Sequence, residues 1–132
     1  MLVHPVAVHF PLALWLTSAV FDLLAWRRDD PLFPRAAFWL VGLGLVGALA
    51  SIASGWSDLM RAERQGVGPG LLLRHRTHSL LAYAATVTYL ASFLWRWRWP
   101  SHRRGGFLPL VLLGAVLVAV AGFLGGQLRT VM

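Results

Sequence analysis

Four of the five histidines lie at the start of two apolar segments that are far apart in the chain. His4 and His9 belong to HPVAVHFP, which opens the first segment, and His75 and His78 belong to RHRTH, which leads into the third. Imidazole is a common ligand of heme iron and of transition metals. In a bundle of helices joined by turns, the first and third helices begin at the same end. The sequence therefore predicts that the four histidines meet at one depth and form a heme or metal site.

The composition places these histidines in a membrane protein. Of the 132 residues, 58% are hydrophobic and only 13% are charged, and the mean hydropathy is +0.64. A helix needs about 20 residues to cross the ~30 Å hydrocarbon core of a bilayer. Four segments approach or exceed that length: residues 5–26, 36–56, 78–95 and 107–127. We expect an all-α fold in which residues 1–132 form one polytopic membrane domain, a four-transmembrane-helix bundle.

The connections between these spans are polar turns. The longest is the second, residues 58–77, in which GVGPG predicts a turn and LLLRHRTH is expected to lie along the membrane interface before the third span. Asp22, near the end of the first span, is expected to pair with Arg27 or Arg28, or to handle protons. The first and third spans share an early histidine, which does not by itself establish an internal repeat.

The net charge of +7 comes from arginine alone, since the chain has no lysine. These arginines flank the apolar spans, which is typical of contact with lipid headgroups, and we expect no nucleic-acid binding. The loops opposite the histidines carry seven arginines and those at the histidine end carry five. This bias places both termini and the histidines on the outer, periplasmic side of a bacterial inner (cytoplasmic) membrane. Without cysteine, this chain has no thiolate metal site, iron–sulfur ligation or c-type heme attachment.

Helical spacing separates the clustered histidines. His75 and His78, three residues apart, share one helix face. His4 and His9, five residues apart, are separated by about 140° around a helix. We place His4 at the helix cap, so the deeper His9 is expected to point into the bundle. His9 and His78 are thus predicted as the axial ligands of a heme b, and His4 and His75 as a second site or as hydrogen-bonding partners of the first.

Small residues below the histidines leave room for a flat ligand. Ala13 follows His9, and Ala82 and Ala85 follow His78, at positions that a bundle normally fills with larger side chains. Arg74 and Arg76, at the mouth, are predicted to meet the propionates of a heme. Two imidazole ligands leave the iron no open position, which favours an electron carrier over a stand-alone enzyme. Its partners would be a quinol or membrane protein and an external redox protein.

Other functions fit the same residues. A copper or zinc site could be built from His4, His9, His75 and His78 with Asp58 nearby, because imidazole suits both metals. All rings would then have to lie about 2.0–2.1 Å from one ion. A non-catalytic subunit or scaffold of a larger membrane complex, or a homo-oligomer, would use the small residues of the spans to pack against neighbours. A transporter is less favoured, because no clear inverted repeat is evident.

The opening HPVAVHFP, the four spans and a last span that runs into two glycines and a polar residue resemble a known bacterial family. It comprises small membrane proteins catalogued as domain of unknown function 2231. The matching residues are His4, Pro5, His9, Phe10, Pro11, Gly125 and Gly126. The resemblance covers nearly the whole chain and implies a four-helix membrane domain. Some members are fused to Rieske or cytochrome c domains, which implies a redox role consistent with heme ligation.

Overall fold

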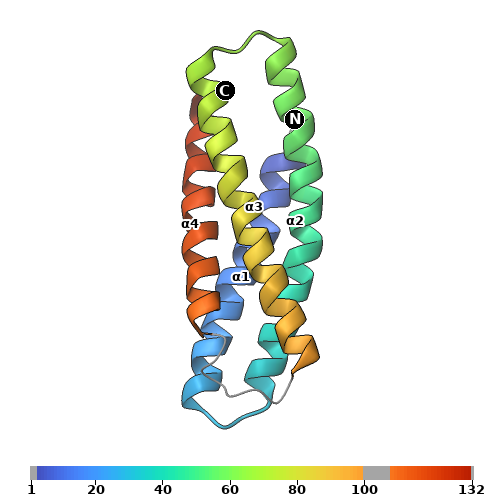
Figure 1. Ribbon diagram of the computed structural model, residues 1–132, viewed down its shortest axis with the longest axis vertical. Helices are drawn as coiled ribbons and strands as arrows, with labels where there is room; N and C mark the ends of the chain where they lie inside the picture. Colours follow the sequence, from blue (N-terminus) through green and yellow to red (C-terminus); the bar gives the residue numbers. More distant parts are fainter. Residues whose placement is uncertain (1–2, 100–107, 132) are drawn as a thin grey trace.

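The chain folds into an elongated bundle of antiparallel helices (Figure 1). The computed structural model describes residues 3–99 and 108–131, and these residues form four helices. The helices are α1 (Val3–Arg27), α2 (Leu32–Arg64), α3 (Pro69–Arg98) and α4 (Leu108–Val131). The predicted all-α fold is confirmed. His102, in the third connection, lies outside the described residues.

Local sequence signals set the turns. The carboxylate of Asp30 accepts a hydrogen bond from the Leu32 N–H at 2.9 Å, which satisfies a free donor at the start of α2. Gly66, after the end of α2, has a φ of 69°, a conformation that glycine adopts readily. Pro69 opens α3, where its missing N–H costs nothing. The residues LLLRHRTH do not form a separate segment before the third span, because they are part of α3, which is continuous from Pro69 to Arg98.

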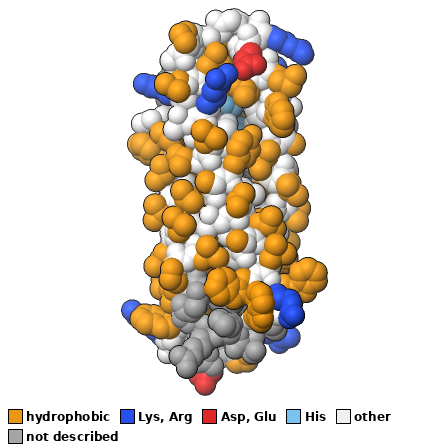
Figure 2. All heavy atoms as spheres, viewed as in Figure 1, with side chains coloured by type: hydrophobic (Ala, Val, Ile, Leu, Met, Phe, Trp, Pro, Cys, Tyr) orange, Lys and Arg blue, Asp and Glu red, His pale blue; other side chains and the backbone are white. Residues whose placement is uncertain are grey.

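Three of these helices are long and apolar enough to cross a membrane within the described part of the chain. They are His4–Arg27, Leu32–Arg64 and Leu108–Leu128. α3, which contains the third predicted span, is not among them, and its crossing stays a prediction; it has 30 residues and lies alongside the others (Figure 1). Figure 2 shows hydrophobic side chains covering the length of the bundle and basic side chains near its two ends. This is the surface of an α-helical membrane protein.

The helices form two hairpins. α1 packs on α2, and α3 packs on α4, more closely than the two hairpins pack on each other. α1 and α3 lie on one diagonal of the bundle, and among the described residues none of their Cα atoms approach within 8 Å. Both helices begin at the same end (Figure 1), as expected from the alternation of spans and turns. Groups on α1 and α3 therefore meet only through long side chains that reach the bundle axis.

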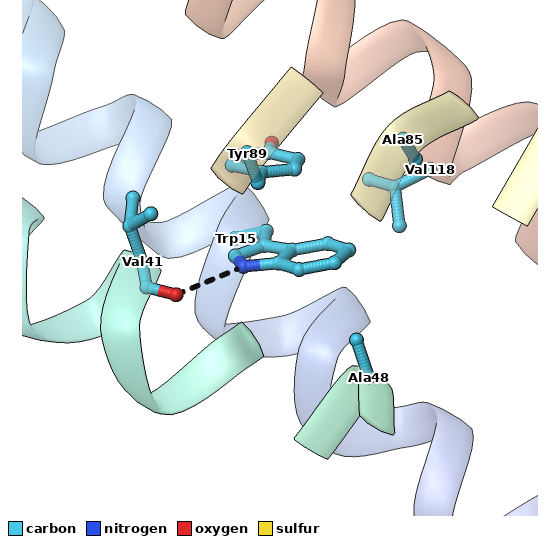
Figure 3. Close-up of a cluster of buried hydrophobic side chains, with 6 residues drawn as sticks. All are labelled: Trp15, Val41, Ala48, Ala85, Tyr89 and Val118. Atoms are coloured by element: carbon cyan, nitrogen blue, oxygen red, sulfur yellow. Dashed lines mark hydrogen bonds between the residues drawn. The ribbon is translucent and has the colours of Figure 1, made fainter. Parts of the chain in front are cut away.

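The core is centred on an aromatic pair that crosses this diagonal. Trp15 of α1 stacks on Tyr89 of α3, with ring centroids 4.2 Å apart and planes inclined by 12° (Figure 3). The Trp15 Nε1–H donates to the Val41 carbonyl at 3.2 Å. A Cβ at Gly44 would collide with the Trp15 indole, and one at Gly114 would lie 2.9 Å from the Tyr89 ring. These two glycines, on α2 and α4, let both rings reach the axis.

A buried ion pair lies on the same diagonal. Arg96 donates from both Nη atoms to the two carboxylate oxygens of Asp22, at 2.7 Å each, and from Nε to Ser92 Oγ at 3.0 Å. Asp22 and Arg96 are each 6% exposed. The prediction that Asp22 pairs with Arg27 or Arg28 is wrong, because Asp22 lies on the face of α1 that meets α3. Its partner therefore comes from a helix 74 residues away.

The two hairpins are an internal repeat. Residues of α1 have counterparts in α3 that lie 74 positions later: His4 and His78, Trp15 and Tyr89, Ser18 and Ser92, Asp22 and Arg96. Glycines of α2 recur in α4 after 70 positions: Gly44 and Gly114, Gly55 and Gly125. α1 and α3 run in the same direction on a diagonal, so an approximate two-fold axis along the bundle relates the hairpins. Few residues are identical, and what repeats is a spacing of histidine, aromatic, serine and charged residue.

Candidate functional site

A cavity of about 550 Å³ lies inside the bundle at the end where α1 and α3 begin. His4, His9, His75 and His78 all line it, which is the convergence expected from the sequence. Trp15 also belongs to the lining and its stacking partner does not, so the aromatic pair marks the inner limit of the cavity. Any ligand of these histidines would sit between the aromatic pair and the outer end of the bundle.

Small side chains keep this space open. Ala82 and Ala85 line the cavity, as expected from their places below His78. Ala48 and Ser51 of α2 contribute to the opposite wall. Ala13, which was expected below a histidine, is exposed on the outer face of α1 and lies outside the lining. The small side chains that leave the cavity open therefore belong to α2, α3 and α4 more than to α1.

The lining follows the two-fold repeat. Most lining positions of α1 and α2 have their counterparts from α3 and α4 in the lining as well. The pairs include His4 with His78, Val8 with Ala82, Leu12 with Thr86, Ala48 with Val118, Ser51 with Ala121, and Gly55 with Gly125. The cavity thus lies on the approximate axis. A flat ligand with two equivalent faces would meet matching groups from both hairpins.

His4 is held by α2. Its Nδ1 lies 2.9 Å from Ser54 Oγ, and this hydroxyl donates its own hydrogen to the Ser51 carbonyl at 3.0 Å. The hydroxyl hydrogen is thereby used, so Nδ1 of His4 is the donor and Nε2 of the neutral ring keeps the lone pair. The ring lies against Gly55, where a Cβ would come within 2.8 Å of Cε1. His4 is partly buried.

His78 is held by α4 in the same manner. Its Nδ1–H donates to the Ala121 carbonyl at 2.8 Å, because a carbonyl oxygen can only accept. The ring lies against Gly125, where a Cβ would come within 2.9 Å of Cε1. In the neutral ring, Nε2 again keeps the lone pair. A ring N–H donated to a protein oxygen, with the other nitrogen left over, is the usual arrangement of a metal-ligating histidine.

His9 differs from both. It is exposed, although it lines one wall of the cavity, and its Nδ1–H donates to the carbonyl of Pro5 in its own helix. The expectation that His9 is the ring directed into the bundle and His4 the cap residue is wrong. α1 already includes Val3, and the eleven residues from His4 to Trp15 make about three helical turns, so His4 shares the inner face of Trp15. His9 falls on the rim.

His75 lies beside His78, in the part of α3 that precedes the predicted span. It is 8% exposed, and its ring centroid is 6.3 Å from that of His78, with planes inclined by 83°. Its Nδ1 lies 3.4 Å from Ser79 Oγ. Burial lowers the pKa of His75, and repulsion from His4 when that ring is protonated lowers it further. The ring is therefore neutral at pH 7 and available as a hydrogen-bonding partner or ligand.

The same residues do not form a ready site for one metal ion. Within residues 3–99 and 108–131, no group of three or more histidine, cysteine, aspartate or glutamate side chains is placed to hold a metal. Asp58 lines the cavity as the sequence suggested, but its carboxylate faces Arg61, 4.0 Å from Nη1. A copper or zinc centre with four histidine ligands stays a prediction.

The arginine at the cavity is not one of those expected. Arg74 lines a separate cavity of about 280 Å³ between α3 and α4, and Arg76 is exposed outside both linings. Arg61 of α2 lines the histidine cavity instead. α2 continues to Arg64, two turns past the predicted end of its span, and this brings Arg61 to the mouth. The sequence signal for Arg61 is its spacing of three residues from Asp58. If α2 continues past residue 56, this spacing places both side chains on one face of the helix.

The comparison with protein families agrees with the resemblance seen in the sequence. A family model described as "Predicted membrane protein (DUF2231)" matches residues 2–132, and the chain belongs to this family. No curated protein and no solved structure matches the chain. The family description supports a location in a lipid bilayer and names no activity, so the function has to be argued from the cavity and its histidines.

Proposed function

We propose that this protein is a membrane b-type cytochrome that holds one heme b in the cavity and passes electrons to or from a redox partner. The observation that carries the proposal is the pair His4 and His78. The two imidazoles hold equivalent positions on α1 and α3. Each donates its Nδ1–H to an oxygen of the neighbouring helix, which leaves the lone pair of Nε2 for a ligand. We assign these two as the axial ligands, with His78 as expected from the sequence and His4 in place of His9.

The cavity fits this group in size and chemistry. About 550 Å³ falls in the range of cofactor pockets, ~300–1,000 Å³, and the lining is mainly apolar. A porphyrin has two equivalent faces, and the two-fold arrangement of the lining offers one imidazole to each. Arg61 at the mouth is the side chain suited to a propionate, because a guanidinium binds carboxylate through paired hydrogen bonds.

Heme would supply a one-electron redox couple, and two histidine ligands leave no open position for oxygen chemistry. The chain's own residues hold and shield the site. Ser54 and the Ala121 carbonyl fix the tautomer and orientation of the two imidazoles. The Trp15–Tyr89 stack closes the inner end of the cavity. These roles suit an electron carrier or a subunit of a redox complex better than a stand-alone enzyme.

The arginine distribution supports one orientation of the bundle in the membrane. The excess of arginine in the loops opposite the histidines supports a cavity on the outer side of a bacterial inner membrane, with the partner protein on that side. Arg61, Arg64 and Arg76 are exposed at the same end of the bundle, which suits an acidic partner.

Titration of purified heme-free protein with hemin tests the proposal. We expect a Soret band that saturates at one heme per chain and a sharp α band after reduction with dithionite. Metal analysis of the protein as purified accompanies the titration. A colourless protein with stoichiometric copper or zinc would overturn the proposal in favour of a metal site. A colourless, metal-free protein that does not take up hemin would leave a structural subunit as the function.

A further inference from the structure

We infer that the cavity has a side opening beside His9 that binds a quinol from the lipid phase, with Nε2 of His9 accepting a hydrogen bond from a quinol hydroxyl. The inference rests on the proposed function for its redox meaning, since a quinol is a membrane-soluble electron donor. The binding itself involves residues of this chain that do not include the assigned heme ligands.

The opening lies between α1 and α4. Residues that line the cavity and are also exposed mark the places where it reaches the surface. On the seam between α1 and α4 these are His9, Gly122 and Gly126, and on the seam between α2 and α3 they are Trp56 and Tyr83. A Cβ at Gly122 would contact Leu12 at 3.5 Å, so Gly122 faces α1 at that level. α1 and α4 are antiparallel, and the next turn brings His9 level with Gly126. A Cβ at Gly126 would meet no atom of the described residues within 4 Å, so these residues leave this side of the seam open.

At the equivalent seam of the internal repeat, the corresponding positions carry larger side chains. On the seam between α2 and α3, Tyr83 holds the position equivalent to His9. The positions equivalent to Gly122 and Gly126 are Ile52 and Trp56, which line the cavity there. One seam thus carries two large apolar side chains where the other carries two glycines. The two-fold symmetry of the cavity is broken at this point, because the seam beside His9 carries the smaller residues.

The opening faces hydrocarbon. His9 and Gly126 lie within the candidate spans His4–Arg27 and Leu108–Leu128. The neighbouring outward side chains Val6, Phe10 and Phe123 are apolar and exposed. A polar group exposed at this depth is costly without a partner. A ligand that satisfies it has to come from the lipid phase.

The imidazole defines the chemistry of that ligand. The Nδ1–H of His9 is donated to Pro5, and the described residues offer the ring no further hydrogen bond. In the neutral ring, Nε2 therefore accepts, and it requires a hydroxyl or N–H donor on a molecule with an apolar body. A phospholipid does not meet this requirement, because its polar groups stay at the interface. A quinol carries a hydroxyl on a flat apolar ring with an apolar tail.

The test measures binding of a decyl-chain benzoquinol to the full chain in lipid nanodiscs, by titration calorimetry under anaerobic conditions. We expect saturable binding at one quinol per chain. His9→Ala should weaken binding about tenfold, the value of one good hydrogen bond. Gly126→Leu, which fills the open side, should abolish binding. The dimethyl ether of the same quinol, which cannot donate, should bind as weakly to the wild type as the quinol does to His9→Ala.

The matched control is Tyr83→Phe, at the equivalent position of the filled seam, which should leave quinol binding unchanged. Helical circular dichroism of each variant shows that it folds. Unchanged binding in both His9→Ala and Gly126→Leu would overturn the inference, as would an equal loss in Tyr83→Phe.

Heme content measured on the same samples separates this inference from the proposed function. Binding with the expected variant pattern in a protein that takes up no heme supports the quinol site and overturns the cytochrome proposal. A heme-loaded protein without saturable quinol binding overturns the quinol site and leaves the cytochrome proposal intact.

Discussion

His4 and His78 hold the same position in the two hairpins of the bundle, 74 residues apart in sequence. Each imidazole lies against a glycine of the neighbouring helix, Gly55 or Gly125, and donates its Nδ1–H to an oxygen of that helix. His9 lacks this arrangement, because its ring bonds to its own helix. The fixed orientation of the equivalent pair, rather than the number of histidines, selects the two ligands.

The first prediction concerns these ligands. His4→Ala and His78→Ala should each lower hemin affinity by more than about 100-fold, beyond the 10- to 100-fold effect of outer-shell changes. His9→Ala should keep the heme spectrum of the wild type, because His9 lies on the rim. Hemin titration followed by absorption measures all three. Loss of heme in His9→Ala together with full retention in His4→Ala would contradict the assignment.

A second prediction concerns the glycines against which the rings lie. Gly55→Ala and Gly125→Ala place a methyl group 2.8 and 2.9 Å from the imidazole Cε1 atoms and must displace the rings. We expect heme affinity to fall by about tenfold in each. Gly126→Ala is the control, because its Cβ would meet no atom within 4 Å in the part of the chain that the structure describes. Equal affinities in all three variants would show that the ring positions do not matter for binding.

The buried ion pair gives a third prediction. Asp22→Asn leaves the Arg96 charge without its partner and should reduce the free energy of unfolding by about 3–5 kcal/mol. The reversed double variant D22R/R96D should recover most of this loss, since the pair is formed again across the same axis. Denaturant unfolding in detergent measures both.

The exposed pair of Asp58 and Arg61 serves as the control for that experiment. Its atoms are 4.0 Å apart in a solvated setting, so Asp58→Asn should change stability by about 0–1 kcal/mol. If D22R/R96D were no more stable than the single variants, the charges would not be acting as a pair.

Tyr89 supplies a fourth prediction. Its hydroxyl is buried and has no hydrogen-bond partner among the described residues. Tyr89→Phe keeps the stack on Trp15 and removes an unsatisfied group, so stability should stay the same or rise by about 1 kcal/mol. Trp15→Phe loses the hydrogen bond to Val41 and should be destabilised. Thermal unfolding compares them, and a large loss in Tyr89→Phe would reveal a partner for the hydroxyl.

The all-helical fold and the meeting of the histidines could be predicted from the sequence. Long apolar segments separated by proline, glycine and charge leave few alternatives to helices joined by turns. The alternation of direction then brings His4 and His78 to one end, whatever the details of packing.

The choice of ligands could not be predicted, because it depends on the rotation of α1 about its own axis. A helix beginning at Pro5 makes His4 a cap residue, whereas α1 begins at Val3 and places His4 in line with Trp15. Inclusion of His4 in the helix puts its ring on the inner face, whereas His9, six residues before Trp15, lies about 120° away around the helix.

The Asp22–Arg96 pair also could not be predicted from local spacing. Its partners come from diagonal helices, and the sequence signal is the 74-residue repeat of histidine, aromatic, serine and charge. The repeat preserves the spacing of these kinds of residue more than their identity. The histidine shared by the two hairpins is therefore not enough to detect it.

The central claim is one heme per chain, held by two imidazoles. The most direct measurement is the low-temperature electron paramagnetic resonance spectrum of the oxidised, hemin-loaded protein, quantified against chain concentration. We predict the low-spin signal of bis-imidazole ligation at one heme per chain, converted to high spin or lost in His4→Ala and in His78→Ala. A high-spin signal in the wild type, or a low-spin signal that both variants retain, would contradict the claim.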